Sequence, residues 1–140
     1  MQYELHMTDQ QLCSLVGHAE RALPSECVAL LFGRLHGALV KVESVRLVEN
    51  VAEADSTSFF VDPEDQYELM MEEEAAKRAM VCIFHSHPAP AYPSSRDLRN
   101  MKLNPVIWLI ASKITGSWKT DAFILIDGEI TEVSVVLVDS

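Results

Sequence analysis

The sequence predicts a mixed α/β fold in which helices pack against a β-sheet. Segments with apolar residues at helical spacing alternate along the chain with short apolar runs that glycine or proline bounds. The chain has 140 residues, of which 49% are apolar and 23% are charged. This is the composition of a folded protein and the length of about one domain. We therefore expect residues 1–140 to form a single domain.

The first half of the chain is expected to form two helices and two strands. A proline at position 24 ends the first helical pattern, and Pro63 suits the first position of the second helix. Short apolar runs bounded by glycine or proline are typical of buried strands. We expect a helix from Thr8 or Asp9 to about Ala22, a strand over Cys27–Phe32, a turn at Gly33–Gly37, a strand over Leu39–Val51 and a helix from Asp62 to Arg78.

The second half is expected to form four strands, together with a proline-rich loop and a short helix. The prolines at positions 88, 90 and 93 exclude a helix or a central strand between them. The Asp127-Gly128 pair is typical of a hairpin turn. We expect strands over Met80–Phe84 and Val106–Ala111, a helix from Ser94 to about Leu103, and a hairpin of Trp118–Ile126 with Ile130–Val138.

Charge and hydropathy limit the partners of the protein. The formal charge is -10, which repels nucleic acid, and we interpret the acidic stretch from Glu53 to Glu74 as a solvated helix face. The longest apolar stretches, Cys27–Phe32 and Val106–Ala111, are far shorter than the roughly 20 residues that span a bilayer. We do not expect the polar start Met1–Glu4 to act as a signal peptide. We expect a soluble, cytoplasmic protein without nucleic-acid or membrane partners, and the sequence leaves a homodimer open.

The three cysteines do not indicate a disulfide framework. Cys13, Cys27 and Cys82 are odd in number, widely spaced and surrounded by apolar residues. We interpret all three as small core residues in a reducing compartment.

The segment of most chemical interest is His85-Ser86-His87, at the end of the predicted strand over Met80–Phe84. Residues i and i+2 of an extended chain point the same way, so the two imidazoles can converge on one ion while Ser86 points elsewhere. Asp97, at the start of the next helix, is the natural third ligand. Two histidines and a carboxylate form a zinc site with one position open for water.

Each part of this pattern has another explanation. The histidines can be hydrogen-bonded residues at a strand end. Ser94-x-x-Asp97 is also a variant of the capping box, in which the serine caps a helix and the acid bonds back to it. Cys82 stands at a Cys-x-x-His spacing from His85, but strand alternation makes these two side chains face opposite ways.

These residues resemble the motif of the JAMM (MPN+) metalloproteases. The motif reads His-x-His-Pro, a spacer and then Ser-x-x-Asp, and the chain has His85-Ser86-His87-Pro88 followed by Ser94-Ser95-Arg96-Asp97. The family also needs an upstream glutamate, and the segment Pro24–Gly33 resembles its surroundings, with Glu26 in that position. The spacer is one residue shorter than is usual in the family, which alters the loop over the site. The resemblance spans about residues 8–126.

The resemblance implies an α/β, single-domain MPN (cytidine-deaminase-like) fold, with a mixed curved β-sheet flanked by helices. It implies one Zn²⁺ per chain, held by His85, His87 and Asp97. In the family's reaction, Glu26 would activate a zinc-bound water as general base and Ser94 would stabilise the oxyanion. The substrate implied is the amide bond after the C-terminal Gly-Gly of a ubiquitin-like modifier or sulfur-carrier protein, in its conjugates or linear extensions, as in compact prokaryotic members.

Two other classes of function are considered. A non-catalytic MPN-type scaffold that binds partners in a complex is the alternative, although scaffold members typically lack part of the set of five residues present here. A zinc nucleoside deaminase has a fold thought to resemble this one, but its His-x-Glu and Pro-Cys-x-x-Cys elements are missing.

Overall fold

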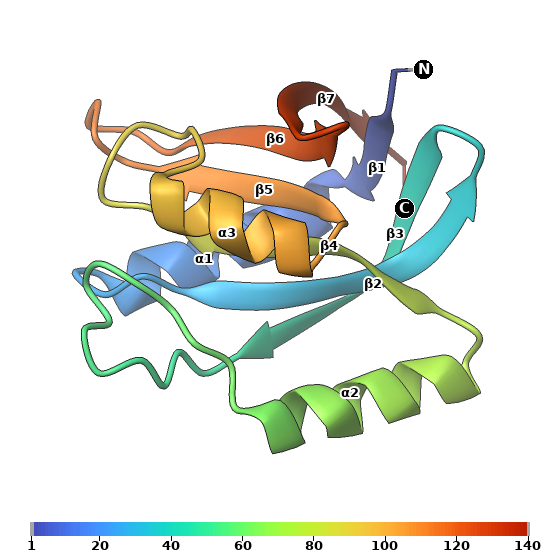
Figure 1. Ribbon diagram of the computed structural model, residues 1–140, viewed down its shortest axis with the longest axis horizontal. Coiled ribbons are helices and arrows are strands. Elements are labelled where there is room, and N and C mark those ends of the chain that lie inside the picture. The colour runs from blue at the N-terminus through green and yellow to red at the C-terminus, as the bar shows by residue number, and fades with distance from the viewer. Residues whose placement is uncertain (1, 140) are drawn as a thin grey trace.

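The computed structural model of the protein describes residues 2–139. Within these residues three helices are interspersed among seven strands (Figure 1). The strands are β1 (Glu4–Thr8), β2 (Val28–His36), β3 (Leu39–Val48), β4 (Ala79–Ser86), β5 (Ile107–Ser112), β6 (Lys119–Ile126) and β7 (Glu129–Val138). The helices are α1 (Asp9–Ala22), α2 (Pro63–Ala75) and α3 (Ser95–Leu103). The predicted mixture of helices and strands is confirmed.

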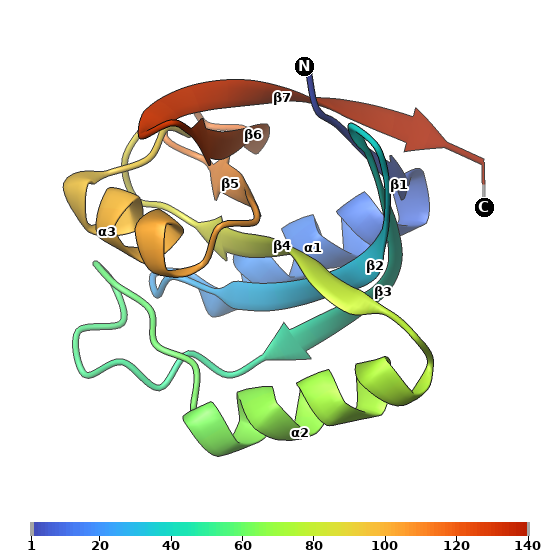
Figure 2. The ribbon, with the colours of Figure 1, turned by 45° about the vertical axis from the view of Figure 1, so that its right-hand side comes forward.

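The strands form a closed barrel in the order β1-β3-β2-β4-β5-β6-β7. It closes through a parallel pair in which Glu4 of β1 lies opposite Ser134 of β7 and Thr8 lies opposite Val138. Figure 2 shows the strands wrapping around a common interior. The prediction of a curved sheet flanked by helices is therefore only partly right, because β1 joins the two edges of that sheet.

One apolar cluster fills the inside of the barrel. It contains buried residues from all of the barrel strands, among them Leu5 of β1, Leu31 of β2 and Leu109 of β5. Leu15 and Ala19 of α1 belong to the same cluster and are fully buried. Side chains from every strand of a closed barrel can be in one cluster only if they face its interior. Helix α1 is therefore anchored to the interior of the barrel.

A second apolar cluster lies on the outer face of the central strands. Leu30 of β2, Ile83 of β4 and Trp108 of β5 contribute to it, and Met101 of α3 covers it. Helix α3 lies in front of β4 and β5 in Figure 1. The candidate site residues lie on this outer face.

Strand β1 is absent from the sequence-based prediction. It is only five residues long, so polar Glu4 and His6 alternate with buried Leu5 and Met7 only twice. A pattern this short is weak evidence for a strand. Its pairing with β7 at the other end of the chain gives it a defined place.

The turn between β2 and β3 is tighter than predicted. Gly33 continues the strand through a β-bulge, and a side chain there would meet the carbonyl oxygen of Lys41 at 1.8 Å. The turn itself lies at Gly37, whose positive φ of 64° suits glycine. The glycine at position 33 therefore marks a close backbone approach and not the start of a turn.

Helix α2 ends at Ala75, three residues before the predicted end at Arg78. Lys77 has a φ of 60°, which leaves the helical conformation, and the amide of Arg78 turns back to the carbonyl of Glu73. Strand β3 likewise ends at Val48, before the predicted end at Val51. Both differences lie at element ends, where local patterns are least informative.

Most acidic residues of α2 are exposed, as predicted, but Glu73 is buried. Its carboxylate accepts hydrogen bonds from Ser44 at 2.7 Å and Arg78 at 2.9 Å, and Arg46 lies 3.3 Å away. Burial alone would raise the pKa of Glu73, yet these partners hold it below its ordinary value. Glu73 therefore links α2 to the rest of the fold as a paired carboxylate.

The cysteine prediction is wrong for Cys13. Cys27 and Cys82 are buried, but Cys13 is exposed. It lies on the side of α1 opposite Leu15 and Ala19, and its thiol is 3.8 Å from the Asp9 carboxylate.

Among residues 2–139, no helix combines the length and apolar character needed to cross a membrane.

Candidate active site

The site lies at the carboxyl end of β4, where the chain leaves the sheet for the loop before α3. His85 is fully buried and the His87 side chain is 10% exposed, and their rings lie 5.6 Å apart. Ser86 points the other way, and its hydroxyl accepts the amide of Cys27 at 2.8 Å. The predicted alternation of these three residues is confirmed. Cys82 packs into the barrel interior, away from the histidines.

The first turn of α3 brings Asp97 to the two histidines. Ser94 accepts the amide of Asp97 at 3.2 Å, and the Asp97 carboxylate accepts the amide of Ser94 at 2.9 Å. This is the capping box considered from the sequence. It also turns the carboxylate toward His85 and His87, so the capping and ligand interpretations are compatible.

Asp97 stands between the imidazoles. Its Oδ1 lies 3.2 Å from Nε2 of His85, and its Oδ2 lies 3.5 Å from Nε2 of His87. Burial alone would lower the pKa of His85, but Asp97 and Glu26 outweigh it and raise this pKa to about 9. Burial would raise the pKa of Asp97, but His85 and His87 hold it below its ordinary value. The site therefore favours a positive charge beside this carboxylate.

Glu26 approaches from the opposite side. Its side chain is 5% exposed, and its Oε1 lies 3.4 Å from Nδ1 of His85. It lies two residues before β2, which pairs with β4 so that Val28 lies opposite His85. The pairing of these two strands therefore brings together residues that are far apart in the sequence.

Ser94 is half-buried at the start of α3. Its oxygen accepts the amide of Asp97, which leaves the hydroxyl proton free for a further partner. The capping interaction therefore leaves one donor at the edge of the site.

The donor atoms fit a small cation. The Nδ1 of His85 lies 3.0 Å from the carbonyl of Ser86, which can only accept, so Nδ1 carries a proton and Nε2 is the nitrogen that a cation could bind in place of a proton. This Nε2 is buried and has no hydrogen-bond partner within the described residues. Zinc–nitrogen bonds of about 2.0–2.1 Å place tetrahedral ligand atoms about 3.3 Å apart, close to the spacings that Asp97 makes.

The three side chains nevertheless contact one another in pairs. In residues 2–139, no three His, Cys, Asp or Glu side chains form a completed metal-binding group. Asp97 uses a different oxygen for each imidazole. Zinc fits the residue types, the unpartnered Nε2 of His85 and the spacing of the donor atoms. In the structure, however, the Asp97 carboxylate pairs with each histidine separately.

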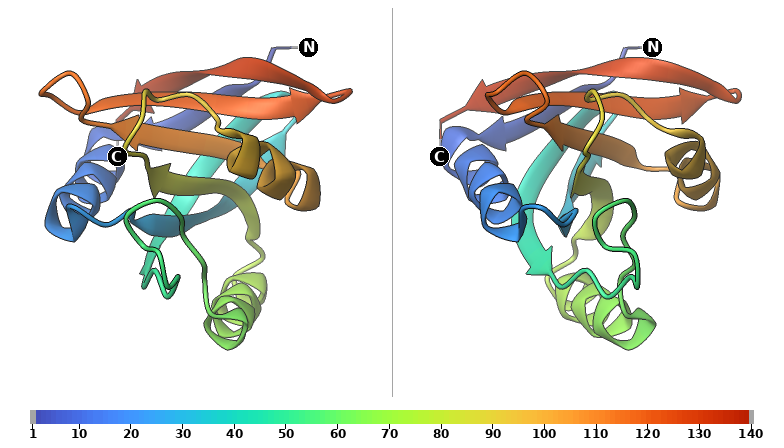
Figure 3. Two further views of the ribbon diagram at one scale, coloured as in Figure 1. Left: turned by 60° about the vertical axis from the view of Figure 1, so that its left-hand side comes forward. Right: turned by 90° about the vertical axis from the view of Figure 1, so that its left-hand side faces the viewer.

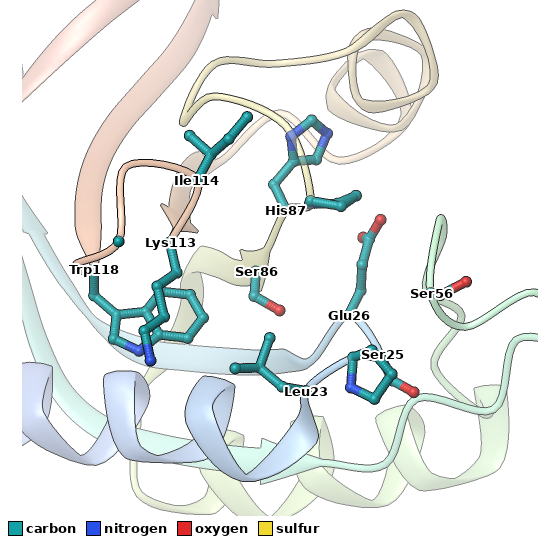
Figure 4. Close-up of a pocket in the computed structure, with 12 residues that line it drawn as sticks. Leu23, Ser25, Glu26, Ser56, Ser86, His87, Lys113, Ile114 and Trp118 are labelled. Carbon is teal, nitrogen blue, oxygen red and sulfur yellow. The ribbon is translucent and has the colours of Figure 1, made fainter.

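A pocket of about 350 Å³ opens beside these residues. Glu26 and His87 line one side, as Figure 4 shows, with Lys113 and Trp118 facing them from the segment between β5 and β6. Leu23 adds an apolar wall from the end of α1. The volume of the pocket lies within the range of small-ligand sites, and Glu26 is part of its lining.

Two features of the site were not found from the sequence. The ring of Phe59 packs on His85 with centroids 4.9 Å apart, which shields that histidine. Glu20 of α1 accepts hydrogen bonds from Trp118 at 2.8 Å and Lys113 at 3.0 Å, and so holds the far wall of the pocket. These residues come from separate loops and helices, and no spacing in the sequence connects them.

Comparisons with known proteins agree with this geometry. A family model described as prokaryotic homologues of the JAB domain matches residues 9–122. A protein of Pyrococcus furiosus named desampylase is 39% identical over 75% of this chain and 74% of its own length. A protein of Thermus thermophilus, named a probable TtuB-protein conjugate cleaving protease, is 31% identical over 86% of this chain and 74% of its own length.

A solved structure shows the same fold. The solution structure of protein DSY2949 from Desulfitobacterium hafniense superposes with a TM-score of 0.85 and 29% identity, covering 97% of this chain and 94% of its own. The resemblance noted from the motif residues is thus confirmed over most of the chain. The protein belongs to the prokaryotic JAB-domain family of JAMM-type peptidases and isopeptidases.

Proposed function

We propose that the protein is a zinc-dependent isopeptidase or peptidase that hydrolyses the amide bond after the C-terminal Gly-Gly of a ubiquitin-like modifier or sulfur-carrier protein. The observation that supports this most is the meeting of His85, His87 and Asp97 with Glu26 at one side of an open pocket. Desampylase and the TtuB-conjugate protease, as the relatives are named, favour a conjugated protein as substrate.

In this proposal His85, His87 and Asp97 hold one zinc ion. Bound zinc supplies a Lewis acid that makes water a stronger nucleophile at neutral pH. The carbonyl of Ser86 fixes the ring of His85 through Nδ1, and the amide of Ser94 fixes the carboxylate of Asp97. Phe59 excludes water from one face of the His85 ring.

Glu26 is the proposed general base and acid. Its carboxylate lies beside His85 and lines the pocket, so it can accept a proton from the attacking water and pass it to the departing amine. Ser94 is the proposed oxyanion donor, because its hydroxyl proton is free after the oxygen has accepted the amide of Asp97. Loss of such a donor typically lowers the rate about 100- to 1,000-fold.

The pocket suits an extended tail that has no side chains near the scissile bond. Leu23, Ile114 and Trp118 contribute apolar walls to the same pocket as Glu26 and His87. A glycine pair can approach such walls more closely than residues with a Cβ.

Three further expectations stay predictions from the sequence. They are the cytoplasmic location, the absence of nucleic-acid and membrane partners, and a homodimer.

The first prediction concerns Glu26. A Glu26→Gln variant keeps the shape of the side chain but cannot accept a proton, so it should lose at least about 100-fold in kcat while retaining its zinc. The assay follows cleavage of ubiquitin-like proteins that carry C-terminal extensions or lysine conjugates. Glu68→Gln, which removes one exposed carboxylate from α2, is the control and should cleave at the wild-type rate.

Two outcomes would contradict this proposal. Cleavage by Glu26→Gln at the wild-type rate would remove Glu26 from the mechanism. A zinc-free wild-type protein that cleaves no substrate would favour the non-catalytic scaffold.

A further inference from the structure

The backbone of Glu26 is held by a loop that is remote in sequence. Glu26 lies two residues before β2 begins at Val28. Its amide donates to the carbonyl of Asp55 at 2.6 Å, and its carbonyl accepts the side-chain amide of Asn50 at 2.8 Å. Both backbone polar groups of this residue therefore bond to residues 50–60, here called the 50–60 loop. Figure 3 shows this loop beside the start of β2.

Asn50 determines how that loop closes. Its Nδ2 donates to the carbonyl of Ser58 at 3.0 Å as well as to Glu26, and its Oδ1 accepts the amides of Ala52 and Phe60, each at 3.0 Å. These four bonds use both amide protons and both oxygen lone pairs. Only one orientation of the side-chain amide satisfies two carbonyls and two N–H groups, so the positions of Oδ1 and Nδ2 are determined by these four bonds.

The rest of the loop touches the site as well. The amide of Val51 donates to the carbonyl of Phe60 at 2.9 Å and closes the loop at its base. Phe59, next to that closure, packs on His85, and Arg96 of α3 donates to the carbonyl of Thr57 at 3.0 Å. The 50–60 loop thus connects Glu26, one histidine and the helix that carries Asp97.

We propose that Asn50 is a positioning residue for catalysis, which sets the place of Glu26 through the 50–60 loop. This proposal rests on the function proposed for Glu26. Asn50 does not line the pocket, so it is not proposed to contact the substrate or the reacting atoms. Its effect comes from fixing the peptide that carries the base, where an error of about 1 Å can reduce a rate about 100-fold.

The test replaces Asn50 by aspartate. Asn50→Asp has the same shape and keeps the acceptor for Ala52 and Phe60, but it places an anion against the carbonyls of Glu26 and Ser58. The matched control is Ser58→Ala, which removes the hydroxyl bond to Ala54 from the same loop and leaves every Asn50 bond intact.

Two measurements are compared. Amide hydrogen exchange by NMR should show faster exchange at Glu26 and Phe60 in Asn50→Asp, with Leu30 of β2 unchanged. Steady-state kinetics should show kcat lowered about 10- to 100-fold and KM changed less than about threefold. Ser58→Ala should match the wild type in exchange at Glu26 and in kcat.

A variant with faster exchange at Glu26 and an unchanged kcat would overturn the proposal, as would unchanged exchange at Glu26. If Asn50→Asp does not fold, amide exchange in the wild-type protein provides the test. Glu26 and Phe60 should then exchange with one common free energy of opening, and clearly different values would refute the coupling. Exchange is measured without substrate, so it remains decisive even if the wild type cleaves nothing, a result that would count against the proposed function instead.

Discussion

Asp97 shows how one residue can serve both the fold and the site. Its carboxylate completes the capping box with Ser94 and contacts both histidines. The sequence pattern Ser-x-x-Asp predicted each use separately. His85, His87 and Asp97 could be predicted as neighbours from their spacing in the sequence, whereas Glu26 was predicted only from the resemblance of its segment to the JAMM family. Phe59 and Asn50 could not be predicted, because their contacts with His85 and Glu26 exist only after the 50–60 loop has folded against β2.

Glu73 leads to a prediction on stability and pH. Its folded pKa lies below the ordinary value of 4.5, so its pairing with Arg46 and Arg78 stabilises the protein above that pH. This contribution is lost as the pH falls through the folded pKa. Replacing Glu73 by Gln should lower the free energy of unfolding by about 1–3 kcal/mol near neutral pH.

The difference between wild type and Glu73→Gln should shrink as the pH is lowered from about 6 to about 3 in urea titrations. Glu74→Gln changes an exposed neighbour and should leave the unfolding free energy within about 0.5 kcal/mol of wild type. A Glu73→Gln deficit that grows toward acid would show that the sign of this pKa shift is wrong.

At the scale of elements, local patterns predicted α1, α3 and the β6–β7 hairpin to within a residue or two. They did not predict β1 or the closure of the barrel. Closure depends on Leu5 and its neighbours pairing with Val135 and its neighbours, at opposite ends of the chain. Such pairing is decided by packing inside the barrel, and no window of sequence contains both partners.

The glycines of β2 and α1 provide an element-scale prediction. Gly33→Ala should destabilise the protein by about 2–3 kcal/mol, because the new methyl group would overlap the carbonyl of Lys41 in the neighbouring strand. Gly17→Ala should stabilise α1 by about 0.5–1 kcal/mol, because its Cβ would meet only the movable end of Arg21 at 3.2 Å. Thermal melts of both variants would check this, and a neutral Gly33→Ala would contradict the close strand contact.

At the scale of the whole molecule, the order of the barrel strands determines where the candidate site lies. Strands β4 and β5 are parallel and are connected through α3, so the end of β4 and the first turn of α3 meet at one edge. Ligand sites favour this edge in sheets with parallel strands. Helix α1 and the segment between β5 and β6 then add the walls that carry Glu20, Lys113 and Trp118. Family membership accounts for the fold, and the site geometry supports the proposal of metal-dependent hydrolysis.

The most direct test of this account is the zinc content of the purified protein, measured by plasma mass spectrometry after gel filtration without chelators. Wild type and Glu26→Gln should each hold about one zinc per chain, while His87→Ala, which removes one of the proposed ligands, should hold almost none. Circular dichroism would verify that His87→Ala is folded. A wild-type protein without zinc, or a folded His87→Ala variant that keeps a full equivalent, would contradict the central claim that His85, His87 and Asp97 form a zinc site.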